Sequence, residues 1–252
     1  MPGPWKILTS ATLALLVMAV ATPASADVKI HGATTVAFGL MNPQKAQIER
    51  LAGVAITILP SSTSHGLTDL VQGKADIAML AEPLETIAAS MNSKQAGFID
   101  LAAYDGQRVG NAYVQFIIHP SNPIQKLTNA QLAGLFSGQI KNWQDIGGAN
   151  LPVLLVGEPT STPHRLIKEA LEIAYSPELR IVQNTNQTAL IVAQAPGAIS
   201  YITTAHDLAI RDKLKLAKTD LKLPLALNLA FRKDTSEEVR RVIAAAAKIG
   251  KE

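Results

Sequence analysis

The chain of 252 residues is 48% hydrophobic and 17% charged, with a net charge of +3, and this combination excludes a disordered protein. Its 23 basic residues outnumber the 20 acidic residues too slightly to indicate a nucleic-acid-binding surface. The absence of cysteine excludes disulfide scaffolds, thiolate metal sites and cysteine nucleophiles, and the length suits one large domain or two small ones.

The first 26 residues have the pattern of a secretory signal peptide. Lys6 is the only charge before the apolar run 13–21, and residues 24–26 read Ala-Ser-Ala, a small-x-small cleavage site. A membrane anchor is the alternative, but a span needs about 20 apolar residues and this run is shorter. We therefore expect cleavage after Ala26 and export to the periplasm, which leaves a mature chain of residues 27–252.

The first half of the mature chain alternates strands and helices. Strands are expected at 28–30, 54–59 and 75–80, because these short runs are apolar or β-branched and end at small or turn-forming residues. A short helix pattern covers 67–71 and stops near Gly73. Strands that alternate with helices pair in parallel through crossover connections, so this order predicts an open α/β sheet.

The second half repeats this alternation after a longer extended run. Residues 109–119 form that run, and Pro120 and Pro123 then break the chain, which favours a crossing between two lobes at this point. Thr128 and Gln131 form a capping box for a helix that ends near residues 137–138. The remaining expected elements are, in order, strand 153–156, a helix from Pro163, strand 180–182, helix 188–194, strand 198–202, strand 223–231 and a helix opened by a second capping box at 235–238.

These elements predict an α/β protein of two similar lobes. Each lobe is expected to be an open, mostly parallel sheet flanked by helices. We expect the first lobe to span residues 27–115 and the second to span 116–205, with residues 206–252 returning to the first lobe.

Three of the expected strand-to-helix loops are rich in hydroxyls and small residues: 32–35, 61–66 and 160–165. In the third loop, Pro163 suits the first helical position, with Thr162 as the N-cap. Such loops gather at the carboxyl ends of the strands, where ligands bind, and free amides at helix N-termini attract anions. Each cluster alone could be a simple helix cap, but the three together predict an oxyanion site formed by hydroxyls and amides.

The other chemistry-bearing residues form no catalytic or cofactor motif. The five histidines show no zinc-enzyme spacing, and the glycine-rich nucleotide-binding motifs and the Gly-x-Ser-x-Gly elbow are missing. An exported hydrolase that uses a His/Ser pair is therefore an alternative without motif support. We expect Asp76 to be a structural carboxylate and Trp143 to be a packing anchor. The sequence predicts a binding protein with neither cofactor nor metal, and no enzyme.

Segment 136–148, which reads FSGQIKNWQDIGG, resembles a signature of phosphate-type ABC-transporter solute-binding proteins. Segments 127–132, 196–201, 32–35 and 73–78 also match that family, so the resemblance covers most of residues 28–231. It implies a type II periplasmic binding protein fold, in which two lobes close on the ligand by a hinge motion. It also implies a monomer that binds phosphate or a related oxyanion and serves an ABC permease of the inner membrane.

The resemblance implies particular ligand-binding residues in each of the three loops. Thr34 and Thr35 of the first loop, and Ser64 of the second, match the positions that hold phosphate in the family. The family's third-loop turn falls on Ser161 and Thr162.

The departures from the family pattern concern charge. The arginine that usually precedes the third-loop turn falls on Gly157, beside Glu158, and an aspartate used by some members falls on Ala81, beside Glu82. Charge-assisted hydrogen bonds are the strong ones, so their loss weakens phosphate binding. His65, His164 and Arg165 are the nearby residues that could replace the missing arginine as partners of the anion. The alternative function is therefore a sensory or protein-interaction role in the cell envelope without tight phosphate binding.

Overall fold

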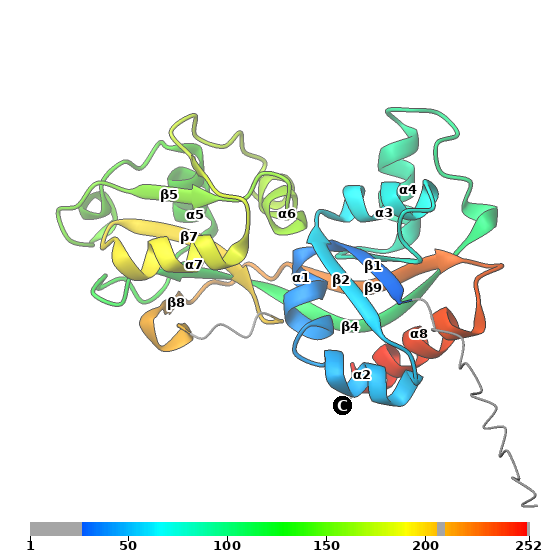
Figure 1. Cartoon of the computed structure of the whole chain (residues 1–252). Helices are drawn as coiled ribbons and strands as arrows, with labels where there is room; N and C mark the ends of the chain where they lie inside the picture. Colours follow the sequence, from blue (N-terminus) through cyan, green and yellow to red (C-terminus); the bar gives the residue numbers. More distant parts are fainter. Residues whose placement is uncertain (1–26, 206–209, 251–252) are drawn as a thin grey trace, which may run out of the picture.

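The computed structural model describes residues 27–205 and 210–250, which form two α/β lobes side by side (Figure 1). The predicted signal peptide, residues 1–26, lies outside the described residues, as does His206. Within the two described ranges, no helix is both long and apolar enough to cross a membrane. The predicted fold class, an α/β protein of two lobes, is confirmed.

The sheet of the first lobe has the strand order β2-β1-β3-β9-β4, in which β1, β2 and β3 are parallel and β9 is antiparallel to both β3 and β4. Figure 1 shows α3 and α4 on one side of these strands and α2 and α8 on the other. The elements of this lobe are β1 (Val28–Ala33), α1 (Thr34–Val36), η1 (Ala37–Met41), α2 (Lys45–Ala52), β2 (Ile56–Ser61), α3 (Thr63–Val71), β3 (Ile77–Leu80), α4 (Leu84–Asn92), η2 (Leu101–Ala103), the first part of β4 (Tyr104–Ile118), β9 (Pro224–Arg232) and α8 (Glu237–Ile249).

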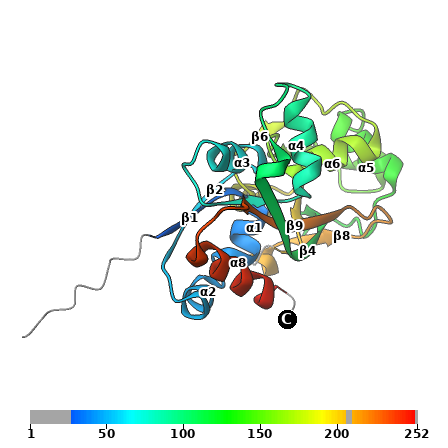
Figure 2. The ribbon, with the colours of Figure 1, turned by 90° about the vertical axis from the view of Figure 1, so that its right-hand side faces the viewer.

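Strand β3 shows why helices cover both faces of this sheet. Ile77 and Met79 belong to one hydrophobic cluster, whereas Ala78 and Leu80 belong to another. Successive side chains of a strand point to opposite faces, so the apolar run of β3 needs cover on both sides. At the end of the chain, α8 returns beside α2, where Arg241 Nε donates a hydrogen bond to the Ala52 carbonyl at 2.8 Å (Figure 2).

The sheet of the second lobe has the order β4-β7-β5-β6, and β8 pairs with the other edge of β4. Strands β5, β6 and β7 are parallel to one another, and β7 is antiparallel to β4. The further elements of this lobe are α5 (Asn129–Ser137), η3 (Trp143–Ile146), β5 (Leu154–Gly157), α6 (Thr162–Leu171), β6 (Arg180–Ile181), α7 (Thr185–Gln194), β7 (Ala198–Thr203), η4 (Arg211–Lys213) and β8 (Lys215–Ala217).

The two lobes are joined inside β4. Its residues up to Tyr113 pair with β9, and those from Val114 onward pair with β7. The sequence predicted the crossing at Pro120 and Pro123, but it lies earlier, within β4. This strand ends at Ile118, before both prolines. A continuous strand keeps its backbone groups paired in both sheets, which a proline break does not. The chain was also predicted to return to the first lobe at residue 206. However, β8 (Lys215–Ala217) still pairs with the second-lobe part of β4, so the chain pairs with the first lobe again only at β9.

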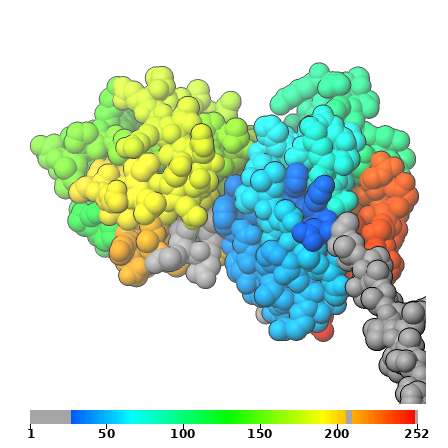
Figure 3. All heavy atoms as spheres, viewed as in Figure 1, coloured from blue at the N-terminus to red at the C-terminus, as the bar shows by residue number. Residues whose placement is uncertain are grey.

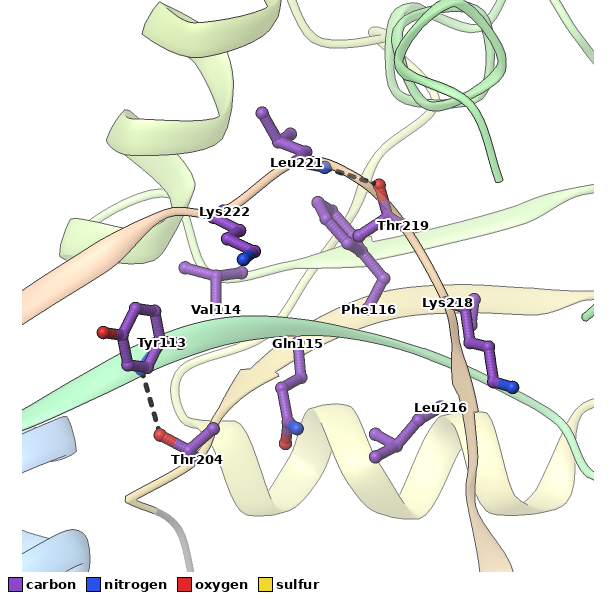
Figure 4. A pocket seen from close by; sticks show the side chains of 11 residues that line it. Tyr113, Val114, Gln115, Phe116, Thr204, Leu216, Lys218, Thr219, Leu221 and Lys222 are labelled. Atoms are coloured by element: carbon purple, nitrogen blue, oxygen red, sulfur yellow. Dashed lines mark hydrogen bonds between the residues drawn. The ribbon is translucent and has the colours of Figure 1, made fainter. Parts of the chain in front are cut away.

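Figure 4 shows how the second crossing segment, 218–223, arches over β4 at this joint. Leu221 and Thr219 of the segment lie above Phe116, and the Leu221 amide donates to Thr219 Oγ1 at 3.1 Å. The space between segment and strand is a cavity of about 480 Å³. None of its lining residues belongs to the three hydroxyl-rich loops, so this cavity is separate from the predicted site.

The observed N-caps agree only in part with those predicted from the sequence. The capping box of Thr128 and Gln131 at α5 is confirmed. Helix α6 is capped by Ser161 and not by Thr162, which is itself the first helical residue. At α8 the N-cap is Ser236, whose hydroxyl accepts from the Val239 amide, so the second predicted capping box does not form. In both cases a neighbouring serine offered an equivalent cap one residue away.

Trp143 is confirmed as a packing anchor of the second lobe. Its side chain is fully buried, and its Nε1–H donates to the Gly197 carbonyl at 2.9 Å. This bond ties the tryptophan-containing segment to the turn that precedes β7, because a buried indole N–H needs an acceptor.

Gly66 of α3 packs directly on Gly32 at the end of β1. A Cβ atom at residue 66 would lie 2.4 Å from the Gly32 Cα and 2.6 Å from the His31 carbonyl oxygen. Gly32 has a φ of 130°, and a Cβ there would lie 2.4 Å from the Met79 carbonyl oxygen. These close approaches place the start of α3 beside the loop that follows β1.

Gly66→Ala is therefore expected to lower the free energy of unfolding by about 1–3 kcal/mol, because the β1 backbone must move to admit the methyl group. Urea denaturation measures this change. Gly110→Ala is the matched control, since a Cβ there would meet Leu227 Cδ1 at an ordinary 3.5 Å. Equal stability of the Gly66→Ala variant and the wild-type protein would contradict this packing.

Candidate functional site between the lobes

The three hydroxyl-rich loops meet around one small cavity between the lobes. Its volume is about 10 Å³, which is close to the room that one water molecule needs. The lining residues come from the ends of β1, β2, β3 and β5 and from the helix starts that follow: Ala33, Thr34, Thr35, Ser61, Ser62, Thr63, Ala81, Glu158, Thr160, Ser161 and Thr162. The furrow between the two lobes is visible in Figure 3.

The lobes touch at this cavity through two threonine hydroxyls. Thr63 Oγ1, from the first residue of α3, lies 3.3 Å from Thr162 Oγ1, from the first residue of α6. Thr63 Oγ1 also accepts a hydrogen bond from the Ala81 amide at 3.3 Å. Both threonines are buried, so the structure shows the lobes closed over the cavity.

Two helices of regular length begin at the cavity. Ser62 caps α3 by accepting from the His65 amide at 3.2 Å, and Ser161 caps α6 by accepting from the His164 amide at 3.3 Å. The start of a helix carries partial positive charge, which favours a bound anion. No lysine or arginine of the described ranges lines the cavity, so hydroxyls and helix amides are the hydrogen-bond donors that it offers to an anion.

The structure brings four of the predicted ligand-binding residues together at the cavity and leaves three outside. Thr34, Thr35, Ser161 and Thr162 line it. The residues outside are Ser64 and His65, which are exposed on α3, and His164, which is buried on α6.

Thr63 is a lining residue of the second loop that the sequence reasoning missed. Because Ser62 is the N-cap, Thr63 is the first residue of α3 and faces the second lobe. Ser64 follows about 100° further round the helix and is exposed. Each of the hydroxyl residues 61–64 could serve as the cap, so the sequence did not give the helix register.

His164 lies next to the cavity lining in an aromatic cluster. Its ring stacks on Tyr175 with centroids 3.7 Å apart, and its Nδ1 lies 2.8 Å from the Tyr201 hydroxyl. Burial lowers the pKa of His164 to about 4, so the imidazole is neutral at pH 7. His164 therefore adds no positive charge to the site.

The same cluster encloses Gly157, the position where the family's arginine would fall. A Cβ atom at residue 157 would lie 3.1 Å from the Tyr201 hydroxyl and 3.1 Å from Leu179 Cδ1. The His164 Nδ1 would be 3.5 Å away. A long side chain at this position has no room unless these three residues move.

Glu158 is the carboxyl among the lining residues. The residue is 5% exposed, and its backbone amide donates to the Tyr201 hydroxyl at 3.0 Å. Within residues 27–205 and 210–250, no hydrogen bond or ion pair to its carboxyl is found. Burial raises the pKa of Glu158 to about 7, because desolvation disfavours the charged form. The charge of this cavity therefore changes near neutral pH.

Glu82 and Arg165 form an ion pair across the cleft beside the cavity. Arg165 Nη2 donates to Glu82 Oε2 at 2.7 Å, and its Nη1 contacts both carboxylate oxygens of Glu169 at 3.0 Å. Burial raises the pKa of Glu82, and Arg165 opposes this shift. Arg165 therefore carries its charge beside the cavity and already has two acidic partners.

Comparison with known proteins assigns the chain to a family of binding proteins. A family model described as the PBP superfamily domain matches residues 19–247. The phosphate-binding protein PstS of Bacillus subtilis (strain 168) is 25% identical over 213 residues, which is 82% of this chain and 66% of that protein. The chain thus spans just under two thirds of the length of this relative.

Solved structures show the same fold. A structure from Clostridium perfringens, described as a substrate-binding protein of a phosphate ABC transporter with bound phosphate, has a TM-score of 0.75 at 20% identity and covers 89% of this chain and 94% of its own. An ABC-type phosphate transport receptor from Vibrio cholerae has a TM-score of 0.64 at 17% identity and covers 87% of this chain and 93% of its own.

Proposed function

The chain belongs to the PBP superfamily, and we propose from this premise that it is a periplasmic solute-binding protein for phosphate or a related oxyanion. It holds the anion between its lobes and delivers it to an ABC permease of the inner membrane. It acts as a monomer and catalyses no reaction. The names of its relatives, a phosphate-binding protein and phosphate transport receptors, support this assignment.

The observation that carries the proposal is the meeting of the three loops at one cavity. Hydroxyls from both lobes line it, and Thr63 and Thr162 touch across the cleft. A bound anion at this point contacts both lobes, so it stabilises the closed state by its differential affinity. Thr34, Thr35, Ser161 and Thr162 are the proposed ligand-binding residues, together with Thr63 of the second loop.

Export is proposed to follow from the leader of residues 1–26, with cleavage after Ala26. The mass of the exported protein is then that of a chain beginning at Asp27. A mass that includes residues 1–26 would contradict cleavage.

A thermal-shift panel with phosphate, sulfate, molybdate and phosphonates tests the proposed function. A ligand at 100 times its dissociation constant adds about 2.7 kcal/mol to the free energy of unfolding. We expect a clear shift with phosphate at pH 6. No shift with any of these anions would contradict the oxyanion site.

A second candidate function is a sensory or protein-interaction role in the cell envelope. It is favoured by the buried carboxyl of Glu158 and by the cavity lining, in which no cation of the described residues takes part. Pull-down from membranes separates the two functions. Recovery of a permease supports transport, and recovery of only a kinase or a cyclase supports the sensory role.

A further inference from the structure

A second and larger chamber continues the cleft beyond the small cavity. Its volume is about 280 Å³, against about 10 Å³ for the cavity. Ala81 and Thr162 line both spaces, so the two are neighbours along the interlobe cleft. The chamber wall is contributed by the start of α4, by α6 and by the start of β9, with Pro83, Leu166 and Leu225 among its apolar residues.

The arginines of the cleft line the chamber and not the cavity. Arg165 is bound to Glu82 and Glu169, as described above. Arg108 is exposed, and its guanidinium donates to Asn111 Oδ1. Among the described residues, no carboxylate forms an ion pair with Arg108. The chamber therefore combines apolar walls with a cation that a ligand can reach.

Size separates the two spaces into two kinds of subsite. In this closed state the cavity has room for about one water molecule, and it is lined by hydroxyls and helix amides from both lobes. The chamber approaches the volume of small-molecule pockets, which begin at about 300 Å³, and its apolar walls gain free energy when they bury carbon. Inorganic phosphate in the cavity would leave the chamber filled only with water.

We propose that the preferred ligand is a small organic phosphate or phosphonate. Its tetrahedral group lies among the hydroxyls of the cavity, and its organic group lies in the chamber between Pro83 and Leu166, within reach of Arg108. This proposal rests on the proposed function and narrows its ligand class. One ligand can occupy both spaces because Ala81, which lines both, places only a methyl group between the cavity and the chamber.

Calorimetric titration of the mature protein tests the proposal with three probes: inorganic phosphate, glycerol 3-phosphate and phosphonoacetate, whose carboxylate can meet Arg108. At least one organic probe is expected to bind at least tenfold more tightly than inorganic phosphate, with one molecule per protein. Titration in the presence of saturating inorganic phosphate is expected to weaken the organic probe, because both use the same cavity.

Thr86→Trp fills the chamber from its edge, since Thr86 is exposed in the first turn of α4 and lines the chamber but not the cavity. We expect this variant to lose the tenfold preference and to keep its affinity for inorganic phosphate. Ser90→Trp, on the same helix and outside the chamber lining, is the matched control and is expected to behave as wild type.

Two results would overturn the proposal while leaving the proposed function intact. One is that inorganic phosphate binds the wild-type protein at least as tightly as both organic probes. The other is that Thr86→Trp weakens inorganic phosphate and the organic probes by the same factor. Binding of none of the three probes would instead contradict the proposed function itself.

Discussion

Glu158→Gln is expected to raise the free energy of unfolding at pH 8 by about 3 kcal/mol and to leave it unchanged at pH 4. The carboxyl has a pKa of about 7 in the folded protein against 4.5 as its ordinary value. Between these values the folded state holds a proton that the unfolded state has lost. Stability therefore falls as pH rises from 4.5 to 7, and stays at its lower level above pH 7. Glutamine carries no charge to bury, so the variant escapes this loss.

His164 gives the wild-type protein an opposite slope. Its pKa is about 4 in the folded state and 6.5 ordinarily, so between these values the unfolded state binds the extra proton. The His164 contribution to stability therefore rises from pH 4 to pH 6.5. In the wild-type protein the two slopes offset each other over most of this range. In the Glu158→Gln variant only the His164 slope remains, so its free energy of unfolding is expected to rise between pH 4 and pH 6.5.

Urea denaturation at a series of pH values from 4 to 8 measures both effects. Glu178→Gln is the control, because Glu178 is exposed and forms a surface ion pair with Lys141, which contributes little. A pH profile of the Glu158→Gln variant that overlays the wild-type profile would show that the Glu158 carboxyl is not desolvated in the folded protein.

The ionisation of Glu158 is also expected to affect the binding of an anion in the cavity. A carboxylate that lines the cavity repels a bound anion, so the wild-type affinity for phosphate is expected to fall as pH rises through 7. Glu158→Gln removes this charge, and its phosphate affinity is expected to change less over the same range. Phosphate titrations of both proteins at pH 6 and pH 8 compare the two.

Thr63→Val is expected to weaken phosphate binding by about 10- to 100-fold, whereas Ser64→Ala changes it by less than about twofold. Valine keeps the shape of threonine and removes the hydroxyl that accepts from the Ala81 amide and meets Thr162 across the cleft. A hydrogen bond to a charged ligand is worth about 1.5–3 kcal/mol, which corresponds to this range. Ser64 is exposed and does not line the cavity, so its hydroxyl faces solvent and does not contact a ligand in the cavity.

Isothermal titration with phosphate measures these affinities, and the double variant Thr63→Val/Thr162→Val extends the test. Because the two hydroxyls contact each other, the double variant is expected to lose less than the sum of the single losses. A greater loss from Ser64→Ala than from Thr63→Val would reverse the assignment of the second-loop residue.

Local sequence signals were sufficient for the alternation of strands and helices and for the three loops. The carboxyl ends of parallel strands meet at one edge of a sheet, so loops 32–35 and 61–66 converge because β1 and β2 pair. Loop 160–165 follows β5 of the second lobe and meets them only because the two lobes are closed on each other. The capping box of Thr128 and Gln131 was also readable, because both partners lie within one helical turn.

Features that depend on distant partners were not readable. An extended run such as 109–119 has the same pattern whichever sheet it joins, so the change of partner between Tyr113 and Val114 left no local trace. The pKa of Glu158 depends on burial beside Tyr201, which lies 43 residues further along the chain. The register of α3 depends on which serine caps it, and a shift of one residue exchanges Thr63 for Ser64 at the cavity.

Equilibrium dialysis with radiolabelled inorganic phosphate tests the central claim, that hydroxyls from both lobes hold an oxyanion at the small cavity. At pH 6 the wild-type mature protein is expected to retain one phosphate per molecule in a saturable manner. The Thr63→Val/Thr162→Val variant, folded by circular dichroism, is expected to retain phosphate only at concentrations at least tenfold higher. No retention by the wild-type protein, or equal retention by both proteins, would contradict the claim.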